Sequence, residues 1–449
     1  MTEERFDIME SKSRILIMIE TTALICLAIV LGLYVSGLAR PAEPEEPSVP
    51  ESLEHDGYTL EQVVVLSRHN IRSPLVGGDS VLSTVTPHEW FGWTSPASQL
   101  SLRGGTLETS MGQYFRKWLE AEELFPENYQ PKKEEVRIYA NSKQRTIATA
   151  QFFTAGLLPA ANEEVEHHGE FDTMDPVFAP CLTYMSDGYV KAAQEQINTL
   201  YYKEIGALAD NYELVSDVID MEESSGAKDG SIKPFRTDDT TVILEKGKEP
   251  AMEGSLKTAC TVSDAMTLQY YEEADPEKAA FGNTLSEEQW TEIADIKDVY
   301  NDVLFTAPLI AANVANPLLK EIDSEMSADG RRFTFLCGHD SNLESVLAAL
   351  EADKYDLPET IEKKTPIGSK LVFTKWRSAD GRLFWDVDMI YQTTEQLRDA
   401  DILTEENHPA SVDLSFRGIS QNSDSLYTDA DIRGRLNESI EKYSELANY

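Results

Sequence analysis

Two short runs of the chain are apolar without alternation: residues 62–67 (QVVVLS) and residues 333–337 (FTFLC). Continuous apolar runs of this length are typical of strands in a parallel sheet covered on both faces. The first run ends in Arg68-His69, and the second ends in Gly338-His339-Asp340. Because open α/β sheets bind ligands at the carboxyl ends of their strands, we expect these residues to share a site.

Segments whose apolar residues have helical spacing follow both predicted strands. An apolar stripe predicts a core helix between Gly105 and the Pro126 break, and a second apolar helix is predicted over residues 147–158. The sequence Ser341-Asn342-Leu343-Glu344 has the form of a capping box, which predicts a helix over residues 342–350. The stripe of the first helix consists of Leu107, Met111, Phe115, Trp118 and Leu119.

Later in the chain, apolar runs at residues 371–376 and 384–389 flank Ala379-Asp380-Gly381, which predicts two strands joined by a turn. Residues 184–299 are mostly polar with helical spacing, interrupted by a Gly/Lys/Asp-rich stretch at residues 224–239. We therefore expect a helical domain over 184–299, inserted into an α/β domain made of 56–183 and 300–449.

The N-terminal part has a different pattern. Residues 15–39 are apolar apart from Glu20 and a few small polar residues, and 21–39 carry no charge, which is close to a membrane-spanning length. A Pro/Glu-rich spacer follows at residues 40–51. We expect residues 1–55 to be a signal or anchor segment with its linker, either cleaved or in contact with the membrane. The protein would then be exported: periplasmic, anchored at the cell surface, or secreted.

The amino-acid composition limits which classes of partner and cofactor the protein could bind. The 449 residues include 79 acidic and 39 basic ones, a net charge of −40, which disfavours nucleic acid as a partner. Of the four cysteines, Cys26 lies in the apolar segment, and the three that remain exclude a complete disulfide framework. No zinc-type spacing of cysteines is present in the sequence. His167-His168 lacks a third and fourth ligand at tetrahedral spacing, so we expect neither a metal nor another cofactor.

The motif with the most specific chemistry is Arg68-His69-Asn70-Ile71-Arg72-Ser73-Pro74. Transfer of a phosphoryl group needs planar cationic donors that grip the nonbridging oxygens and a nucleophile in line with the leaving oxygen. Arg68 and Arg72 are candidates for the donors, and His69 is the candidate nucleophile.

Two further segments fit the same chemistry. His339 could bond a phosphoryl oxygen, and Asp340 could donate a proton to the ester oxygen, although Asp340 could instead be a turn or capping residue. Arg145 lies in the first turn of the predicted helix over 147–158, an unfavourable place for a cation unless an anion binds there. A solvated surface arginine is the alternative.

Together, Arg68-His69-x-x-Arg72-x-Pro74 and Gly338-His339-Asp340 resemble the double signature of the histidine acid phosphatases. The stretches YANSKQRTIATAQFF, TMDPVF, DAMTLQYYEE and TPIGSKLVF are similar to one branch, the exported bacterial glucose-1-phosphatases. The resemblance implies a phosphoglycerate-mutase-like fold: a mixed, largely parallel sheet flanked by helices, with a smaller inserted all-α domain.

The resemblance also implies roles for single residues. His69 would be the nucleophile and Asp340 the proton donor. Glu249 would contact the substrate near the inserted domain, and Asn70 stands where phytase-like members usually carry glycine. The phosphoryl group would be bound by Arg68, Arg72, Arg145 and His339.

The function expected from these residues is hydrolysis of a small phosphomonoester through a phosphohistidine, with glucose 1-phosphate or a related sugar phosphate as substrate. An inositol-phosphate phosphatase is the alternative enzyme, which the acidic composition and Glu249 disfavour. A surface protein that binds phosphate without turnover is the alternative from another class, and the presence of both His69 and Asp340 disfavours it.

Overall fold

A mixed sheet forms the centre of the computed structural model, which describes residues 53, 55–74 and 80–449. Within this part of the chain the sheet has eight strands, in the order β10-β8-β7-β1-β6-β2-β3, with β9 paired to β8. The strands are β1 (Tyr58–Arg68), β2 (Val136–Ala140), β3 (Val165–Glu166), β6 (Phe333–Gly338), β7 (Lys370–Ser378), β8 (Leu383–Tyr391), β9 (Ala410–Asp413) and β10 (Tyr427–Thr428). β1, β6, β2 and β3 are parallel, whereas β7 and β8 add to the sheet antiparallel. The prediction of a mixed, largely parallel sheet is confirmed.

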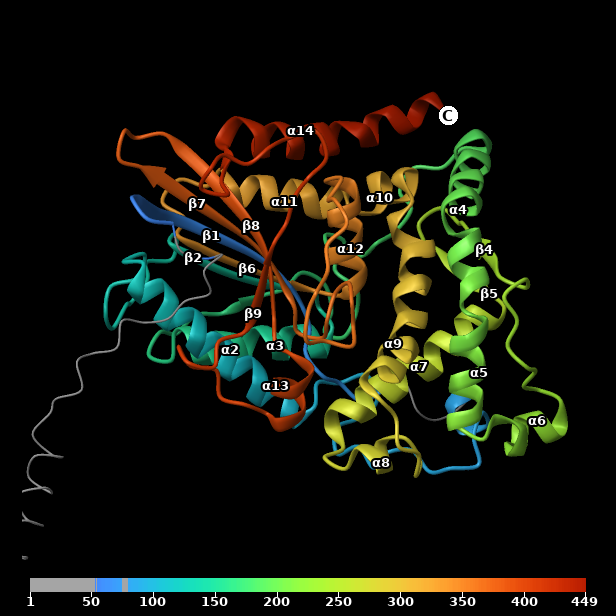
Figure 1. Cartoon of the computed structure of the whole chain (residues 1–449). Coiled ribbons are helices and arrows are strands. Elements are labelled where there is room, and N and C mark those ends of the chain that lie inside the picture. The colour runs from blue at the N-terminus through green and yellow to red at the C-terminus, as the bar shows by residue number, and fades with distance from the viewer. Residues whose placement is uncertain (1–52, 54, 75–79) are drawn as a thin grey trace, which may run out of the picture. The chain divides into compact units, whose positions relative to one another are not determined.

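Both faces of the sheet are covered by helices, as the apolar runs predict. Val63 and Val65 of β1 pack into the core cluster with α2 (Leu102–Ala121) and α3 (Gln144–Leu157). Val64 and Leu66 point to the other face. In Figure 1 the two layers lie below and above the sheet. The second layer consists of α11 (Asn316–Met326), α12 (Asp340–Ala349) and α14 (Asp429–Glu445).

Each of the three predicted helices that flank the strand ends begins two or three residues earlier than expected. α12 begins at Asp340 with His339 as its N-cap, not at Asn342 with Ser341 as cap. The reason is that Asn342 Oδ1 accepts the backbone N–H of His339 over 2.9 Å, which closes the first turn two residues earlier than the Ser341 pattern suggests. The first stripe helix, α2, also starts early because the side chain of Ser101 accepts the N–H of Gly104.

The predicted turn at residues 379–381 is confirmed. β7 and β8 pair antiparallel across it, and the N–H of Gly381 donates to the carbonyl of Ser378 over 2.8 Å. Gly381 has a φ of +86°, a conformation that glycine adopts without a steric cost.

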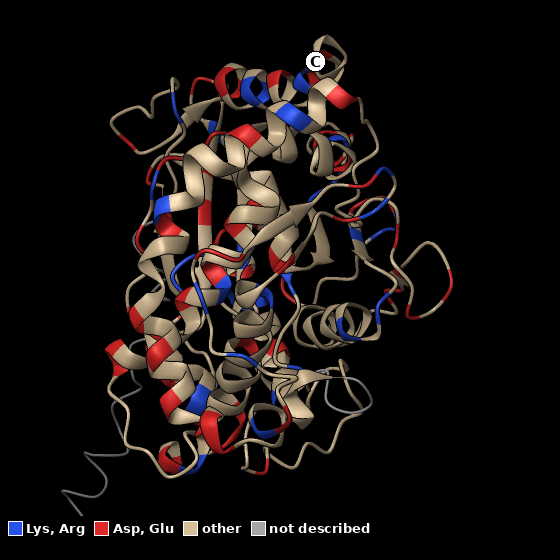
Figure 2. Cartoon of the chain, turned by 90° about the vertical axis from the view of Figure 1, so that its right-hand side faces the viewer, with Lys and Arg blue, Asp and Glu red and all other residues tan. Residues whose placement is uncertain are grey.

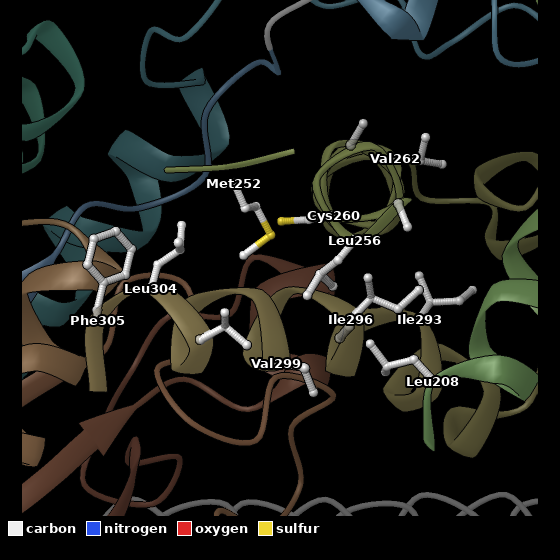
Figure 3. Packing of buried hydrophobic residues seen from close by; sticks show 14 of the residues in the cluster. Leu208, Met252, Leu256, Cys260, Val262, Ile293, Ile296, Val299, Leu304 and Phe305 are labelled. Carbon is white, nitrogen blue, oxygen red and sulfur yellow. The ribbon is translucent and has the colours of Figure 1, made fainter. Parts of the chain in front are cut away.

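Residues 184–301 form mostly helices. They are α4 (Asp187–Ala207), α5 (Ala209–Val218), α6 (Ser225–Asp229), α7 (Ser255–Glu272), α8 (Pro276–Ala279) and α9 (Glu287–Asn301), with short strands β4 (Thr241–Ile243) and β5 (Ala251–Glu253). α7 and α9 pack side by side, and Figure 3 shows Leu256 of α7 facing Ile296 of α9, with Cys260 of α7 beside Met252 of β5. The limits of an inserted domain stay a prediction, since the same core cluster includes Ile71.

Short elements complete the described part of the chain. α10 (Pro308–Val314) and α13 (Thr394–Asp399) are the remaining α-helices there, with single turns at Val81–Ser83, Met221–Glu223, Asp302–Thr306 and Leu446–Asn448. Asp and Glu are scattered over helices and loops in Figure 2 rather than gathered in one patch. Among the described helices, none is long and apolar enough to cross a membrane. The predicted signal or anchor at residues 15–39 lies outside the described residues.

Candidate active site

His69 is held by backbone contacts to β6 and to the loop that leads into β7. It follows β1 directly, and the register of β1 with β6 places Arg68 beside Gly338. The N–H of His69 donates to the carbonyl of Gly338 over 3.0 Å, and the carbonyl of His69 accepts from Gly368 over 3.1 Å. The sheet therefore brings the carboxyl ends of β1 and β6 together, as the sequence predicts.

The imidazole of His69 has a defined tautomer. Nδ1 lies 2.9 Å from the carbonyl oxygen of Asn70, and because a carbonyl only accepts, Nδ1 carries the proton. Nε2 is then the nitrogen with the lone pair. Burial lowers the pKa of His69 well below its ordinary value, and the charges of Arg145 and the other nearby arginines lower it further. The ring is therefore neutral and able to act as a nucleophile.

The three predicted arginines approach the site from different sides. Arg68 is 2 % exposed, and its Nη1 donates to Glu362 over 2.7 Å. Arg72 donates to Asp264 over 2.8 Å. Nη2 of Arg145, in the first turn of α3, lies 3.3 Å from Nδ1 of His339.

Arg145 is the least compensated of these cations. Its Nε is buried and has no hydrogen-bond partner among the described residues. Burial, together with the charge of Arg72, lowers the pKa of Arg145 to about 10. A cation placed at a helix N-terminus in this way is stabilised when an anion binds between it and its neighbours.

His339 is oriented by a residue that sequence reasoning missed, Asn141. Oδ1 of Asn141 accepts the N–H of Asp175 over 2.8 Å, so its Nδ2 is the atom that donates to Nε2 of His339 over 2.6 Å. Burial, followed by the charge of Arg145, lowers the pKa of His339 well below its ordinary value. The neutral ring therefore carries its proton on Nδ1, beside Arg145, where an anion could accept it.

Asp340 faces two cations. Its Oδ2 lies 2.8 Å from Nζ of Lys297 and 3.5 Å from Nη2 of Arg68. Burial by itself raises the pKa of Asp340, but Lys297 and Arg68 outweigh it and hold that pKa well below the ordinary value. Lys297, like Asp264 and Glu362, is a site residue that the sequence analysis did not single out.

Most of these side chains line one cavity of about 420 Å³. Glu249 lies at the same cavity and is exposed to solvent. Arg68 is the one predicted site residue outside its lining, although its Nη2 lies 3.5 Å from Oδ2 of Asp340, which does line the cavity. The predicted residues that line the cavity are His69, Arg72, Arg145, Glu249, His339 and Asp340. A larger hollow of about 800 Å³ around Arg398 and His408 holds none of them.

Asn70 does not belong to the lining of this cavity. It is fully buried, and its Nδ2 donates to Glu108 over 2.9 Å, while Lys370 pairs with the same carboxylate over 3.1 Å. A Cβ atom on Gly368 would lie 2.5 Å from Nδ2 of Asn70, so the loop packs tightly on this amide. Asn70 therefore packs beneath the segment that carries His69 and does not face the cavity.

The described residues contain no group of three or more His, Cys, Asp or Glu side chains arranged to hold a metal ion. Cys181, Cys260 and Cys337 are free thiols. The cationic side chains that line this cavity among the described residues are Arg72, Arg145, Lys257 and Lys297.

Comparison with known proteins gives consistent matches. The family described as histidine phosphatase superfamily (branch 2) matches residues 59–392. A glucose-1-phosphatase from Salmonella typhimurium is 38% identical over 371 residues, 81% of this chain and 88% of the relative. A glucose-1-phosphatase from Providencia rettgeri is 37% identical, covering 83% and 90%. Among solved structures, the apo form of Hafnia alvei phytase has a TM-score of 0.79 at 27% identity, covering 87% and 99%.

Proposed function

The chain belongs to branch 2 of the histidine phosphatase superfamily and hydrolyses phosphomonoesters. On this premise we propose that it acts on glucose 1-phosphate or a related sugar phosphate through a phosphohistidine at His69. The observation that carries the proposal is the unprotonated Nε2 of His69 in the cavity that Arg72, Arg145 and Asp340 line. A phosphate dianion bound in this cavity would contact a neutral nucleophile and several cationic hydrogen-bond donors.

In the first step, Nε2 of His69 attacks phosphorus and the bond to the sugar oxygen breaks. Asp340, protonated from solvent, gives its proton to that oxygen as it leaves. In the second step, Asp340, now ionised, takes a proton from water while the water oxygen attacks phosphorus. The P–N bond then breaks, and inorganic phosphate leaves.

The arginines and His339 stabilise the charge on the nonbridging oxygens in both steps. Arg145 and Nδ1–H of His339 lie side by side and would bind one edge of the phosphoryl group. Arg72 would bind another edge, and Arg68, which also contacts Asp340, would complete the set. No step of this scheme is assigned to a metal ion.

A sugar monophosphate is favoured over an inositol polyphosphate by charge. Glu249 lies at the cavity, and the net charge of −40 adds a repulsive field for polyanions. The relatives at 37–38% identity are glucose-1-phosphatases, whereas the phytase structure is 27% identical. An inositol-phosphate phosphatase is the second candidate, supported by the high TM-score of that phytase. A protein that only binds phosphate would have no use for an unprotonated His69 Nε2 at the same cavity as Asp340.

We also propose that the protein is exported, on the strength of the apolar segment at residues 15–39 and the spacer after it. Either cleavage or retention of the segment as an anchor is compatible with its length. N-terminal sequencing of the protein recovered from its own cells would decide between them, and an intact N-terminus on cytosolic protein would contradict export.

The catalytic proposal is tested by rapid quenching with ³²P-labelled substrate. The native enzyme should acquire acid-labile, base-stable label within one turnover, and His69→Ala should acquire none. Asp340→Asn should be impaired on glucose 1-phosphate far more than on p-nitrophenyl phosphate, whose leaving group needs little protonation. Near-native turnover by His69→Ala would refute the mechanism, and a strong preference of the native enzyme for inositol hexakisphosphate would refute the substrate class alone.

A further inference from the structure

Lys297 is buried among three carboxylates at the active-site cavity. It comes from α9 and is 9 % exposed. Its Nζ lies 2.8 Å from Asp340 Oδ2, 3.2 Å from Asp264 Oδ1 and 3.8 Å from Glu362 Oε1. Burying an ammonium group is costly unless it is paired, and these three partners compensate it.

The position of Lys297 is fixed from two sides. Ile293 and Ile296 of the same helix are fully buried, so this face of α9 packs into the core and carries the ammonium with it. Asp264 of α7, which pairs with Lys297, is held in turn by Arg72. The ammonium therefore contacts Oδ2 of Asp340 from a rigid support on a different helix from α12.

We propose that Lys297 is a positioning residue that holds the Asp340 carboxylate ionised and oriented before a substrate binds, and that it thereby sets how acidic the medium must be for hydrolysis. This inference rests on the proposed role of Asp340 as the proton donor. Lys297 touches no reacting atom in this scheme, because it acts through the carboxylate.

The direction of the effect follows from charge. An ammonium 2.8 Å from a carboxylate favours the ionised form, whereas the first step needs the protonated form. Removing the ammonium makes protonation of Asp340 easier, so the form that can donate a proton persists to higher pH. Other charged or titratable groups also face Asp340. They are Arg68 and His69 at the end of β1, Arg145 of α3, Cys260 and Asp264 of α7, Tyr300 of α9, Glu362, and His339 and Glu344 beside or on α12.

The test compares kcat/KM against pH for two substrates in the native enzyme, Lys297→Met and Lys297→Arg. With glucose 1-phosphate, the alkaline limb of Lys297→Met should move to higher pH, so that the ratio of kcat/KM at pH 7 to its plateau value at the acidic optimum rises about 10-fold, as expected for a shift of about one pH unit. With p-nitrophenyl phosphate the ratio should change little. Lys297→Arg, which restores the cation, should return the profile toward that of the native enzyme.

Lys364→Met is the matched control, because Lys364 pairs with Asp302 and does not line the cavity. Its profile should stay unshifted. Asp340→Asn, measured alongside, separates the two proposals: if it retains hydrolysis of glucose 1-phosphate, the proposed mechanism fails. If Asp340→Asn behaves as expected but Lys297→Met loses activity equally on both substrates with no shift in pH, the role of Lys297 is overturned. Should Lys297→Met not fold, Lys297→Gln carries the same expectations.

Discussion

Arg72 donates a hydrogen bond from Nη2 to Oδ2 of Asp264 over 2.8 Å. The other oxygen of the same carboxylate lies 3.2 Å from Nζ of Lys297. Burial by itself raises the pKa of Asp264, but Arg72 and Lys297 outweigh it and lower that pKa to about 2. One of the proposed phosphate-binding arginines is thus already neutralised by the protein before a substrate arrives.

Asp264→Asn should therefore tighten the binding of inorganic phosphate. The amide keeps the size of the side chain and an acceptor for Arg72, but it removes a negative charge that competes with the anion. We expect the inhibition constant of phosphate to fall by about 3- to 10-fold, the effect of roughly one charge at partly screened distance. Asp220→Asn, which alters an exposed carboxylate paired with His88, is the control at matched salt. Weaker binding in Asp264→Asn would mean that orientation of Arg72 outweighs its charge.

Glu249→Gln should change the choice between substrates. If Glu249 contacts a sugar hydroxyl and repels additional phosphates, the amide should lower kcat/KM for glucose 1-phosphate by about 10-fold and spare or improve hydrolysis of inositol hexakisphosphate. Both constants are measured at the same ionic strength, since exposed charges are screened within about 10 Å at 0.1 M salt. Equal losses on both substrates would show that Glu249 supports the cavity without selecting among substrates.

Asp298 makes the fold more stable in acid. Burial raises its pKa from an ordinary 3.8 to about 7, against the charge of Lys364 and with help from nearby carboxylates. The folded state therefore binds this proton more tightly than the unfolded chain does. The resulting stabilisation is complete below about pH 4 and is lost as the pH rises from about 4 to 7.

Replacing the Asp298 carboxyl group tests whether this residue stabilises the fold at low pH. Asp298→Asn keeps an oxygen that can accept the N–H of Lys363, but it does not titrate. Its free energy of unfolding should fall less between pH 5 and pH 8 than that of the native protein, by about 2 kcal/mol. Urea unfolding at several pH values measures this, with Asp210→Asn on the exposed face of α5 as control. An unchanged slope would mean that Asp298 is ionised in the folded protein.

Removal of metal ions should leave turnover intact. The charge on the phosphoryl group is balanced in our scheme by Arg68, Arg72 and Arg145, so dialysis against a chelator should change kcat by less than about twofold. Vanadate, which adopts the geometry of the transferring phosphoryl group, should inhibit competitively. Activity lost on chelation and restored by a divalent ion would contradict the scheme.

The strand ends were predictable because their signal is local. One apolar run leads directly into Arg68-His69, and the other leads into His339-Asp340 after one glycine. Both patterns can be recognised from the sequence alone. In the structure, the register of β1 with β6 brings the two strand ends together. Arg145 was predictable for a similar reason, since a cation in the first turn of a helix is out of place without an anion.

Lys297, Asp264 and Glu362 were missed because they act through contacts distant in sequence. A weak signal existed for two of them. Lys297 interrupts the apolar face of α9, at helical spacing from Ile293, and Asp264 is the single charged residue between Lys257 and Glu272 of α7. Glu362 lies in a loop, where neither periodicity nor motif marks it, and only the fold places it against Arg68.

The order of strands in the sheet also determines how early during synthesis the active fold can form. β6 is inserted between β1 and β2, with Phe333 beside Val63 on one side and Val136 on the other. β1 and β2 therefore cannot pair with β6 until about three quarters of the polypeptide has been synthesised. Strand pairing between such distant segments forms slowly. A nascent or truncated chain that stops before β6 has neither a closed sheet centre nor the proposed proton donor, so it cannot hydrolyse sugar phosphates. For the export proposed above, this late assembly means that the chain has no hydrolase activity until β6 has been made and has paired with both neighbours.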